Sequence, residues 1–302
     1  MALDLLVYGN PTIDEIVRKD RVHILPGGGV FFSSMAAASL GCRVRLIGNV
    51  GHDYPSKYLS WLKQHSVDVA LLQRVQGSTT RFRIRYENDK RKLWLLASGA
   101  EINSSGILPY GAVHLAPVFN EIAIPDIFRV RSKCEFLSID YQGMIRTADT
   151  TRLVKTVRRR LGNVLRICNI AKGSVEEFNR MGLWEKQNRR LRRLLLHGPE
   201  FALITLGKHG SILAIRNGSQ FSIPAFPDPD AFDPTGAGDV LIGSWLSVYL
   251  RTHDPVWSAA VGSAFASLTS RKMGLSKFVF SRNELLRRSA WVYTRVKRFR
   301  RP

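Results

Sequence analysis

Cysteine is scarce in this chain of 302 residues, and no long hydrophobic run is present. The three cysteines, Cys42, Cys134 and Cys168, are too few and too far apart for a disulfide framework or a zinc site, and they fit a reducing cytoplasm. No apolar run approaches the roughly 18 residues of a membrane helix. The first ten residues lack the basic start of a signal peptide. We therefore expect a cytoplasmic protein that has no membrane partner.

Acidic residues are also in short supply, because 24 Asp+Glu face 45 Lys+Arg and leave a net charge of +21. Such a charge invites a nucleic-acid interpretation. Two stretches supply 17 of the 21 charges: residues 151–193 with a net of +10, and the basic tail 282–302 with a net of +7. Aromatic residues interleave with the tail's charges, which nucleic-acid binding allows but a docked amphipathic helix explains better. We favour solvated helix faces and expect no nucleic-acid partner.

Short apolar runs alternate with helix-like segments along the chain, and several runs are apolar on both faces, as in buried parallel strands. The expected strands are Asp4–Tyr8, Val44–Gly48, Val113–Ala116, Phe136–Asp140, Val164–Cys168, Phe201–Leu206 and Ile212–Ile215. The expected helices lie near residues 30–40, 54–66, 147–161, 187–197, 238–251 and 255–271. This alternation predicts a three-layer α/β fold with a doubly wound, mostly parallel sheet. Ligands bind such folds beyond the carboxyl ends of the strands.

The segment Thr79–Leu96 breaks this pattern, because Phe82, Ile84 and Tyr86 alternate with arginines in the manner of a β-hairpin. A two-stranded piece is marginal alone, so we expect it to join strands from residues 12–25. The resulting small β-sheet lid, from about 10–26 and 79–102, is predicted to cover a site within one domain of residues 1–302. The hairpin's apolar face would permit a homodimer through the lid. Thr79 and Thr80 are weaker candidates for substrate contact, since β propensity explains them equally well.

The strongest chemical signal is the string Asp-Pro-Thr-Gly-Ala-Gly-Asp at residues 233–239, followed by the apolar run Val240–Leu250. Gly236 and Gly238 let backbone N–H groups approach an anion closely. The helix that begins there points its positive dipole end at the same place. The string therefore predicts a cradle for a phosphoryl group. Asp239, in the first helical turn, is placed to take a proton from an attacking hydroxyl.

This string resembles the signature of the ribokinase-like (PfkB) family of carbohydrate and nucleoside kinases. The resemblance covers nearly the whole chain, because further motifs follow in the family's order: Gly9–Asp14, Pro26–Gly29, Leu40–Gly41, Val50–Asp53 and Thr205–Gly210. It implies a kinase that uses ATP and Mg²⁺ to phosphorylate a hydroxyl group.

The resemblance also implies roles for the matching residues. The catalytic group comprises Gly236, Ala237 and Gly238 as the anion hole, Asp239 as the base, and Arg146. The substrate-binding group is Asp14, Gly28, Gly29, Phe32, Gln142, Arg146 and Asp239. The nucleotide-binding group is Lys172, Ser174, Glu177, Thr205, Gly207, Gly210, Gly236, Gly238 and Ser263. Ser263 falls where the family's last helix lines the adenine, although small residues also serve plain helix packing.

Two family features are altered in this chain. Phe32 stands where the family usually has an Asn that binds a sugar hydroxyl, so a simple ribokinase is disfavoured. The family's Asn-x-x-Glu motif is replaced by the stretch Lys172–Glu177, in which Ser174 stands for the Asn and Glu177 for the Glu. We expect Mg²⁺ to have no direct protein ligand here, with Glu177 acting on it through a bound water.

Four stretches look like those of one branch, the myo-inositol 3-kinases: Val50–Asp53, Asp140–Arg146, Lys172–Ser174 and Gly274–Phe278. A cyclic polyol needs many hydrogen-bond donors and acceptors, which Asp14, Gln142 and Arg146 would supply. Arg146 equally suits the paired oxygens of a phosphate. A capping network after the strand Phe136–Asp140 also explains Gln142 and Arg146.

The leading prediction is thus an ATP- and Mg²⁺-dependent kinase of a small polyol or sugar, with myo-inositol as the best candidate. A nucleoside kinase of the same family is the first alternative, because Phe31 or Phe32 would offer a slot for a base. A nucleic-acid-binding protein on a kinase-like fold is the second. The sequence leaves the phosphorylated hydroxyl, the donor and the oligomeric state open.

Overall fold

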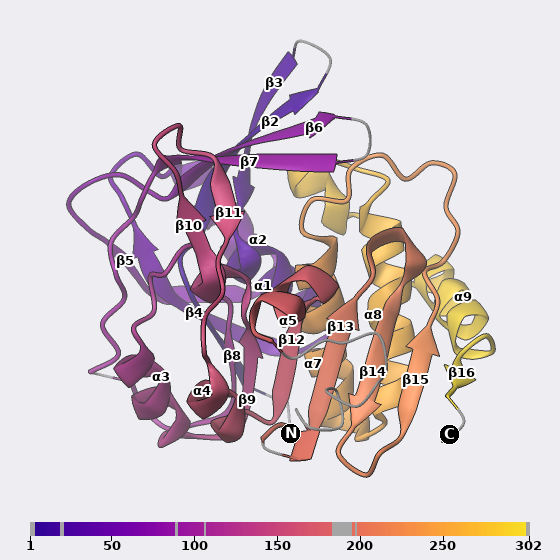
Figure 1. The fold of residues 1–302 in the computed structure, drawn as a ribbon. Helices are drawn as coiled ribbons and strands as arrows, with labels where there is room; N and C mark the ends of the chain where they lie inside the picture. Colours follow the sequence, from indigo (N-terminus) through magenta and orange to yellow (C-terminus); the bar gives the residue numbers. More distant parts are fainter. Residues whose placement is uncertain are drawn as a thin grey trace.

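The computed structural model describes residues 4–18, 21–87, 90–105, 107–182, 195–196 and 198–299. Within them, one large sheet runs through ten strands (Figure 1). In spatial order these are β16 (Lys297–Arg298), β15 (Gln220–Ile223), β14 (Ser211–Ile215), β13 (Phe201–Thr205), β12 (Ile170–Ser174), β9 (Cys134–Asp140), β8 (Tyr110–Leu115), β1 (Asp4–Tyr8), β4 (Arg43–Val50) and β5 (Val67–Arg74). The strands from β13 to β5 pair in parallel, and β13 to β16 pair antiparallel.

Helices cover both faces of this sheet, because successive side chains of a strand point to opposite sides. Leu5 and Val7 enter the core beneath α1, α7 and α8, whereas Leu6 and Tyr8 enter the core beneath α3, α4 and α5. The first layer contains α1 (Gly29–Ser39), α2 (Ser56–Gln64), α7 (Ala237–Thr252), α8 (Pro255–Thr269) and α9 (Arg282–Tyr293). The second contains α3 (Ile124–Arg131), α4 (Gly162–Ile167) and α5 (Val175–Arg180). The predicted three-layer fold is confirmed.

A second sheet lies above the carboxyl ends of the parallel strands and forms the lid (Figure 1). Its order is β3 (Arg21–Gly27), β2 (Thr12–Arg18), β6 (Arg81–Glu87) and β7 (Lys90–Ala97). Phe82 and Ile84 on β6 are buried, while Arg83 and Arg85 face solvent. The hairpin and its partner strands are therefore as predicted. Its apolar face, however, covers the interior and is not free to pair two copies.

Two sequence predictions between residues 147 and 168 are wrong. Residues 147–161 do not form a helix, because the Asp149 carboxylate accepts hydrogen bonds from Thr151 and from the Leu153 N–H and fixes a turn. This turn joins β10 (Arg146–Ala148) to β11 (Val154–Thr156). Residues 164–168 are not a strand but belong to α4 and its end, because a short apolar run suits either element.

The strand expected at 164–168 is instead β12, which carries the polar residues Lys172 and Ser174 and so lacks a strand-like pattern. The helix expected at 187–197 lies largely outside the described residues. Strand Ile212–Ile215 and helices near 30–40, 54–66, 238–251 and 255–271 are present with shifted ends.

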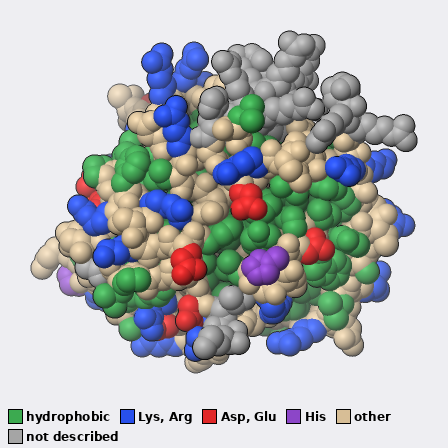
Figure 2. Space-filling model, turned by 90° about the horizontal axis from the view of Figure 1, so that it is seen from below, with side chains coloured by type: hydrophobic (Ala, Val, Ile, Leu, Met, Phe, Trp, Pro, Cys, Tyr) green, Lys and Arg blue, Asp and Glu red, His purple; other side chains and the backbone are tan. Residues whose placement is uncertain are grey.

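The basic tail begins with α9, which packs on the body as the docked-helix interpretation predicts. Trp291 meets Phe226 edge to face at 5.1 Å, and Tyr293 meets Trp257 at 5.4 Å. Arg288 is fully buried and pairs with Asp228 and Glu284. Figure 2 views the molecule from below, and on this face the Lys and Arg side chains are dispersed among apolar and acidic ones. The described Lys and Arg side chains on this face do not form a continuous basic patch.

Candidate active site

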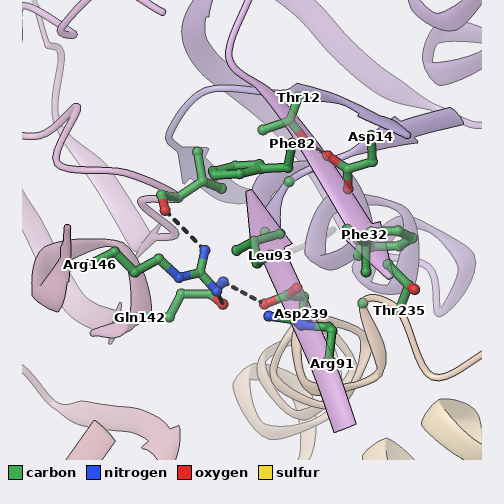
Figure 3. A pocket seen from close by; sticks show the side chains of 15 residues that line it. Thr12, Asp14, Phe32, Phe82, Arg91, Leu93, Gln142, Arg146, Thr235 and Asp239 are labelled. Carbon is green, nitrogen blue, oxygen red and sulfur yellow. Dashed lines mark hydrogen bonds between the residues drawn. The ribbon is translucent and has the colours of Figure 1, made fainter. Parts of the chain in front are cut away.

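A pocket lies between the lid and the carboxyl ends of the central strands (Figure 3). Its lining combines charged and polar groups, from both the lid and the strand ends, with apolar side chains of the lid. The lining residues are Thr12, Asp14, Gly28, Gly29, Phe32, Phe82, Ile84, Arg91, Leu93, Val118, Gln142, Arg146, Thr235, Gly236 and Asp239. The structure thus brings together every residue of the substrate-binding group expected from the sequence.

Asp14 reaches the pocket from the lid strand β2. Its carboxylate accepts a hydrogen bond of 2.7 Å from the Thr12 hydroxyl two residues earlier (Figure 3). The residue is only 5% exposed, and burial raises the pKa of its carboxyl to about 6. The side chain is therefore a strong hydrogen-bond acceptor for a substrate hydroxyl at neutral pH.

The loop before α7 presents its backbone to the same pocket. Gly236 is the N-cap residue and has a φ of 78°, a left-handed conformation that favours glycine. A side chain on Gly236 would begin 2.3 Å from the ring of Phe32, so no other residue fits. At the start of α7 the Gly238 N–H has no helical carbonyl to bond, whereas the Ala237 N–H, also expected in the anion hole, donates to the Pro234 carbonyl at 3.0 Å. The result is the anion cradle that the sequence predicts.

Asp239 lies in the first turn of α7, and its carboxylate faces the pocket (Figure 3). It accepts a hydrogen bond of 3.3 Å from the Gln142 amide, and its Oδ1 lies 3.5 Å from Lys172 Nζ. Burial raises the pKa of this carboxyl to about 6, and the nearby Lys172 ammonium works against that rise. A carboxylate with this pKa is ionised at neutral pH and able to accept a proton.

Gln142 and Arg146 form a network on the pocket wall opposite the lid. They lie on the 3-10 helix η1 (Gln142–Ile145) and at the start of β10. Arg146 donates to the Val118 carbonyl at 3.0 Å and to the Gln142 side-chain oxygen at 2.9 Å (Figure 3). The fixed guanidinium in turn orients the Gln142 amide toward Asp239. The network therefore both caps the strand end and faces the pocket, so the two interpretations from the sequence are compatible.

The nucleotide-binding group from the sequence lies along the carboxyl ends of β12 and β13 and on α8. Ser174 is the N-cap of α5 and forms a capping box with Glu177, whose Oε2 accepts from the Ser174 N–H at 2.6 Å. Thr205 pairs in register with Ser174. Gly207 and Gly210 flank the short helix η2 (Gly207–His209), and the Ser263 hydroxyl donates to the Pro224 carbonyl. Lys172, two residues before the end of β12, lies against Asp239 and Gly238.

Within the described residues, no three His, Cys, Asp or Glu side chains lie together as a metal site. Glu177 nevertheless fits the water-mediated contact with Mg²⁺ expected from the sequence. One of its carboxylate oxygens is taken by the capping box, and the other has no protein partner among the described residues. A hydrated cation such as Mg²⁺ suits an acceptor of this kind.

Several lining residues were not singled out from the sequence as site residues. Arg91 and Leu93 on β7 enter the pocket beside Phe82 and Ile84, and the alternation of the hairpin is the signal that places them on one face. Thr79 and Thr80 do not line the pocket. The Thr79 hydroxyl bonds Asp53, and the Thr80 hydroxyl accepts from the Gly99 N–H, so both serve the fold.

The lid is also joined to the anion loop. Arg18 at the end of β2 forms an ion pair of 3.2 Å with Asp233, which is fully buried and also pairs with Lys277. Tyr86 on β6 shares a hydrogen bond of 2.7 Å with the Thr235 hydroxyl. The strands that carry Asp14 and the apolar wall are thus tied to the segment that leads into the anion cradle.

Comparison with known proteins agrees with this geometry. The family model described as "pfkB family carbohydrate kinase" matches residues 1–105 and 132–279 of this chain. The chain belongs to the pfkB family of carbohydrate kinases. This pfkB kinase is therefore a phosphotransferase with an alcohol group as acceptor. A nucleoside kinase of Methanothermobacter thermautotrophicus is 27% identical over 320 residues, with 96% of this chain and 97% of the relative covered.

Solved structures resemble this pfkB kinase over nearly its whole length. One concerns the conversion of a pyrophosphate-dependent myo-inositol-1 kinase into a myo-inositol-3 kinase, with a TM-score of 0.77, 22% identity and coverage of 96% and 99%. Another is the ribokinase of Arabidopsis thaliana complexed with ribose and ATP, with a TM-score of 0.75, 18% identity and the same coverage. At these identities the likeness concerns the fold, and it confirms the ribokinase-like sheet and lid.

Proposed function

We propose that this pfkB kinase transfers the γ-phosphoryl group of ATP to a hydroxyl of a small polyol or sugar, with myo-inositol as the leading acceptor. The observation that carries the proposal is the position of Asp239. Its carboxylate faces the pocket, which Gly236 also lines, and it belongs to the same turn of α7 as the anion cradle. A hydroxyl in that pocket would therefore lie beside a base and a phosphoryl site at once.

The chain's own residues supply positioning and charge stabilisation, which is what phosphoryl transfer requires. Asp14 and Gln142 orient the acceptor. Asp239 takes the proton of the attacking hydroxyl. The Gly238 N–H at the start of α7 stabilises the charge on the transferred group. The apolar side chains of the lid exclude water from the reaction. When bound, Mg²⁺ neutralises charge on the donor phosphates, and Glu177 would hold one of its waters.

The lining supports a compact polyol as acceptor. Asp14 on the lid and Gln142 and Arg146 on the opposite wall offer acceptors and donors to the pocket, while Ile84 and Leu93 form an apolar pair across the lid strands. The myo-inositol kinase with a similar fold became a 3-kinase when an Asn and a Ser were replaced by leucines.

A nucleoside is the second candidate acceptor. The relative from Methanothermobacter thermautotrophicus is a nucleoside kinase, and two aromatic rings, Phe32 and Phe82, line the pocket. An aromatic face suits a nucleobase. The two candidates therefore differ in what they require of the lid: a nucleoside needs room for its base beside Phe82, whereas a polyol needs only hydrogen-bonding partners for its hydroxyl groups.

A panel of acceptors and donors tests the proposal. Purified protein with Mg²⁺ is assayed on myo-inositol, ribose, cytidine and adenosine, with ATP or pyrophosphate as donor. We expect the highest kcat/KM with myo-inositol and ATP, because Asp14, Gln142 and Arg146 offer polar partners to several hydroxyl groups. A higher kcat/KM with cytidine or adenosine would reassign the acceptor. Turnover with pyrophosphate alone would reassign the donor, and no turnover of any acceptor would refute the proposal.

Surroundings and assembly complete the proposal. The three cysteines are free, which accords with a cytoplasmic location. No helix among the described residues is long and apolar enough to cross a membrane.

A homodimer through the lid would use β3, where Val22 and Ile24 are each 55% exposed. Light scattering tests this assembly. The double variant Val22→Glu, Ile24→Glu should be a monomer if the wild type is a dimer. A monomeric wild type would contradict the proposed homodimer. We propose no nucleic-acid partner.

A further inference from the structure

A buried ion pair lies directly beneath the anion loop. Lys172 on β12 is 5% exposed and Asp140 at the end of β9 is fully buried, and the two residues are neighbours across adjacent parallel strands. The Lys172 ammonium lies 2.5 Å from the Asp140 carboxylate. A buried pair of this kind rarely repays its desolvation through stability alone. Because the ion pair lies against the anion loop, we expect it to act in the active site.

The Lys172 ammonium also faces α7. Its Nζ lies 3.5 Å from Oδ1 of Asp239. A side chain on Gly238 would begin 3.1 Å from the same atom, so the ammonium rests against the first turn of the helix. Asp140 accepts a further hydrogen bond of 2.9 Å from the Gln142 N–H. One buried carboxylate thus holds both residues that contact Asp239.

The charges around Asp239 come from every element packed on it. Lys172 on β12 and Arg146 on β10 favour its ionised form, whereas Asp140 on β9 disfavours it. Across the pocket, Asp14 on β2 is the second acidic group of the lining, and Arg91 on β7 is the cation that the lid strands contribute to the lining. Glu177 on α5 acts on Lys172 from the far side. Lys172 is the cation closest to the Asp239 carboxylate among the described residues.

We infer that Lys172, held by Asp140, is a positioning residue that keeps Asp239 ionised and aimed at the acceptor hydroxyl. The inference rests on the proposed role of Asp239 as base, and it differs from the nucleotide-binding role expected from the sequence. Burial lowers the pKa of Lys172, but the carboxylates of Asp140 and Asp239 outweigh burial and hold this pKa above its ordinary value. Lys172 therefore keeps its proton while Asp239 receives the proton of the acceptor hydroxyl.

The pH dependence of kcat/KM tests this role. Wild type should lose activity as the pH falls through about 6, because Asp239 then becomes protonated. Lys172→Met keeps most of the side-chain volume and removes the charge. We expect its acidic limb to move upward by about one to three pH units, with activity partly recovered at high pH. Lys172→Arg keeps the charge and should move the limb less.

Asp140→Asn provides the opposite arm of the test. Removing the second carboxylate leaves Asp239 as the partner of Lys172, so the acidic limb should move downward. Damage to the fold would lower kcat in both variants and leave the limb in place. Thermal melts of both variants check folding, and Lys155→Met, an exposed lysine in the β10–β11 hairpin, is the matched control.

The outcomes separate this inference from the proposed function. An unmoved acidic limb in Lys172→Met, together with a raised KM for the donor, would assign Lys172 to the nucleotide and overturn the inference. If Lys172→Met does not fold, an unmoved or upward limb in Asp140→Asn alone contradicts it. If Asp239→Asn keeps the kcat of wild type, Asp239 is not the base and the proposed mechanism itself fails; an acidic limb that remains in this variant belongs to Asp14, whose carboxyl pKa is also about 6.

Discussion

Asp239→Asn is expected to lower kcat by about 10²–10⁴-fold, the usual loss when a general base is removed. The amide keeps the size of the side chain and its contact with Gln142, but it cannot take the proton of the attacking hydroxyl. Because the backbone of the anion cradle is unchanged, donor binding should remain close to that of wild type. Steady-state kinetics with the best acceptor and calorimetric titration of the donor measure the two effects separately.

The fold of this variant should not suffer. Burial raises the pKa of the Asp239 carboxyl to about 6, so ionisation of this group opposes folding as the pH rises through that value. Replacing it by a neutral amide removes that opposition, and the melting temperature at pH 8 should be no lower than that of wild type. Asp149→Asn, an equivalent change in the β10–β11 turn, is the control for activity. A retained kcat in Asp239→Asn would assign the proton to another group.

The sequence predicts the anion cradle and the candidate base more completely than it predicts the strands and helices that position them. Gly236 and Asp239 belong to one contiguous string, so their juxtaposition follows from the chain itself. Asp14 and Phe82 are distant in sequence, but the period-two alternation around each places them on strands of one lid. Local patterns of this kind predict the structure correctly because few other backbone arrangements satisfy them.

The rest depends on pairing between distant strands, which no local pattern reveals. Lys172 reads as a polar interruption in an apolar stretch, and only the register of β12 against β9 shows that it meets Asp140. The run at 164–168 reads as a strand, yet Val164 and Leu165 pack from a short helix into the same core. A helix and a strand can both bury four apolar residues, and tertiary packing decides between them.

The lid contacts show a further limit of sequence reasoning. Nothing in the pattern of β2 indicates that Arg18 pairs with Asp233, or that Tyr86 reaches the Thr235 hydroxyl. Both contacts join the lid sheet, whose Asp14 is proposed to bind the acceptor, to the segment before the anion cradle. The closed lid therefore holds the two halves of the site in one arrangement, which is the alignment that phosphoryl transfer demands.

Gly236→Ala probes this alignment and is expected to produce the second large effect. The new Cβ would lie 2.3 Å from Phe32 Cγ, and the residue would keep a φ of 78° that L side chains rarely adopt. Phe32 is buried in α1 beside Phe31 and has little freedom to yield. The loop must therefore move, and displacement of the cradle by about 1 Å is expected to lower kcat roughly 10²-fold.

Two further variants separate the steric contact from the backbone strain. Gly77→Ala also places a side chain at positive φ, but nothing lies within 4 Å of it, so its kcat should match wild type. Adding Phe32→Ala to Gly236→Ala removes the ring from the new Cβ and should restore part of the lost kcat, although acceptor KM rises with the loss of a lining residue. If the double variant recovers none of the lost kcat, the left-handed backbone of Gly236, and not its contact with Phe32, determines the position of the anion cradle. If Gly236→Ala is fully active, the N–H groups of this loop do not stabilise the transferred phosphoryl group.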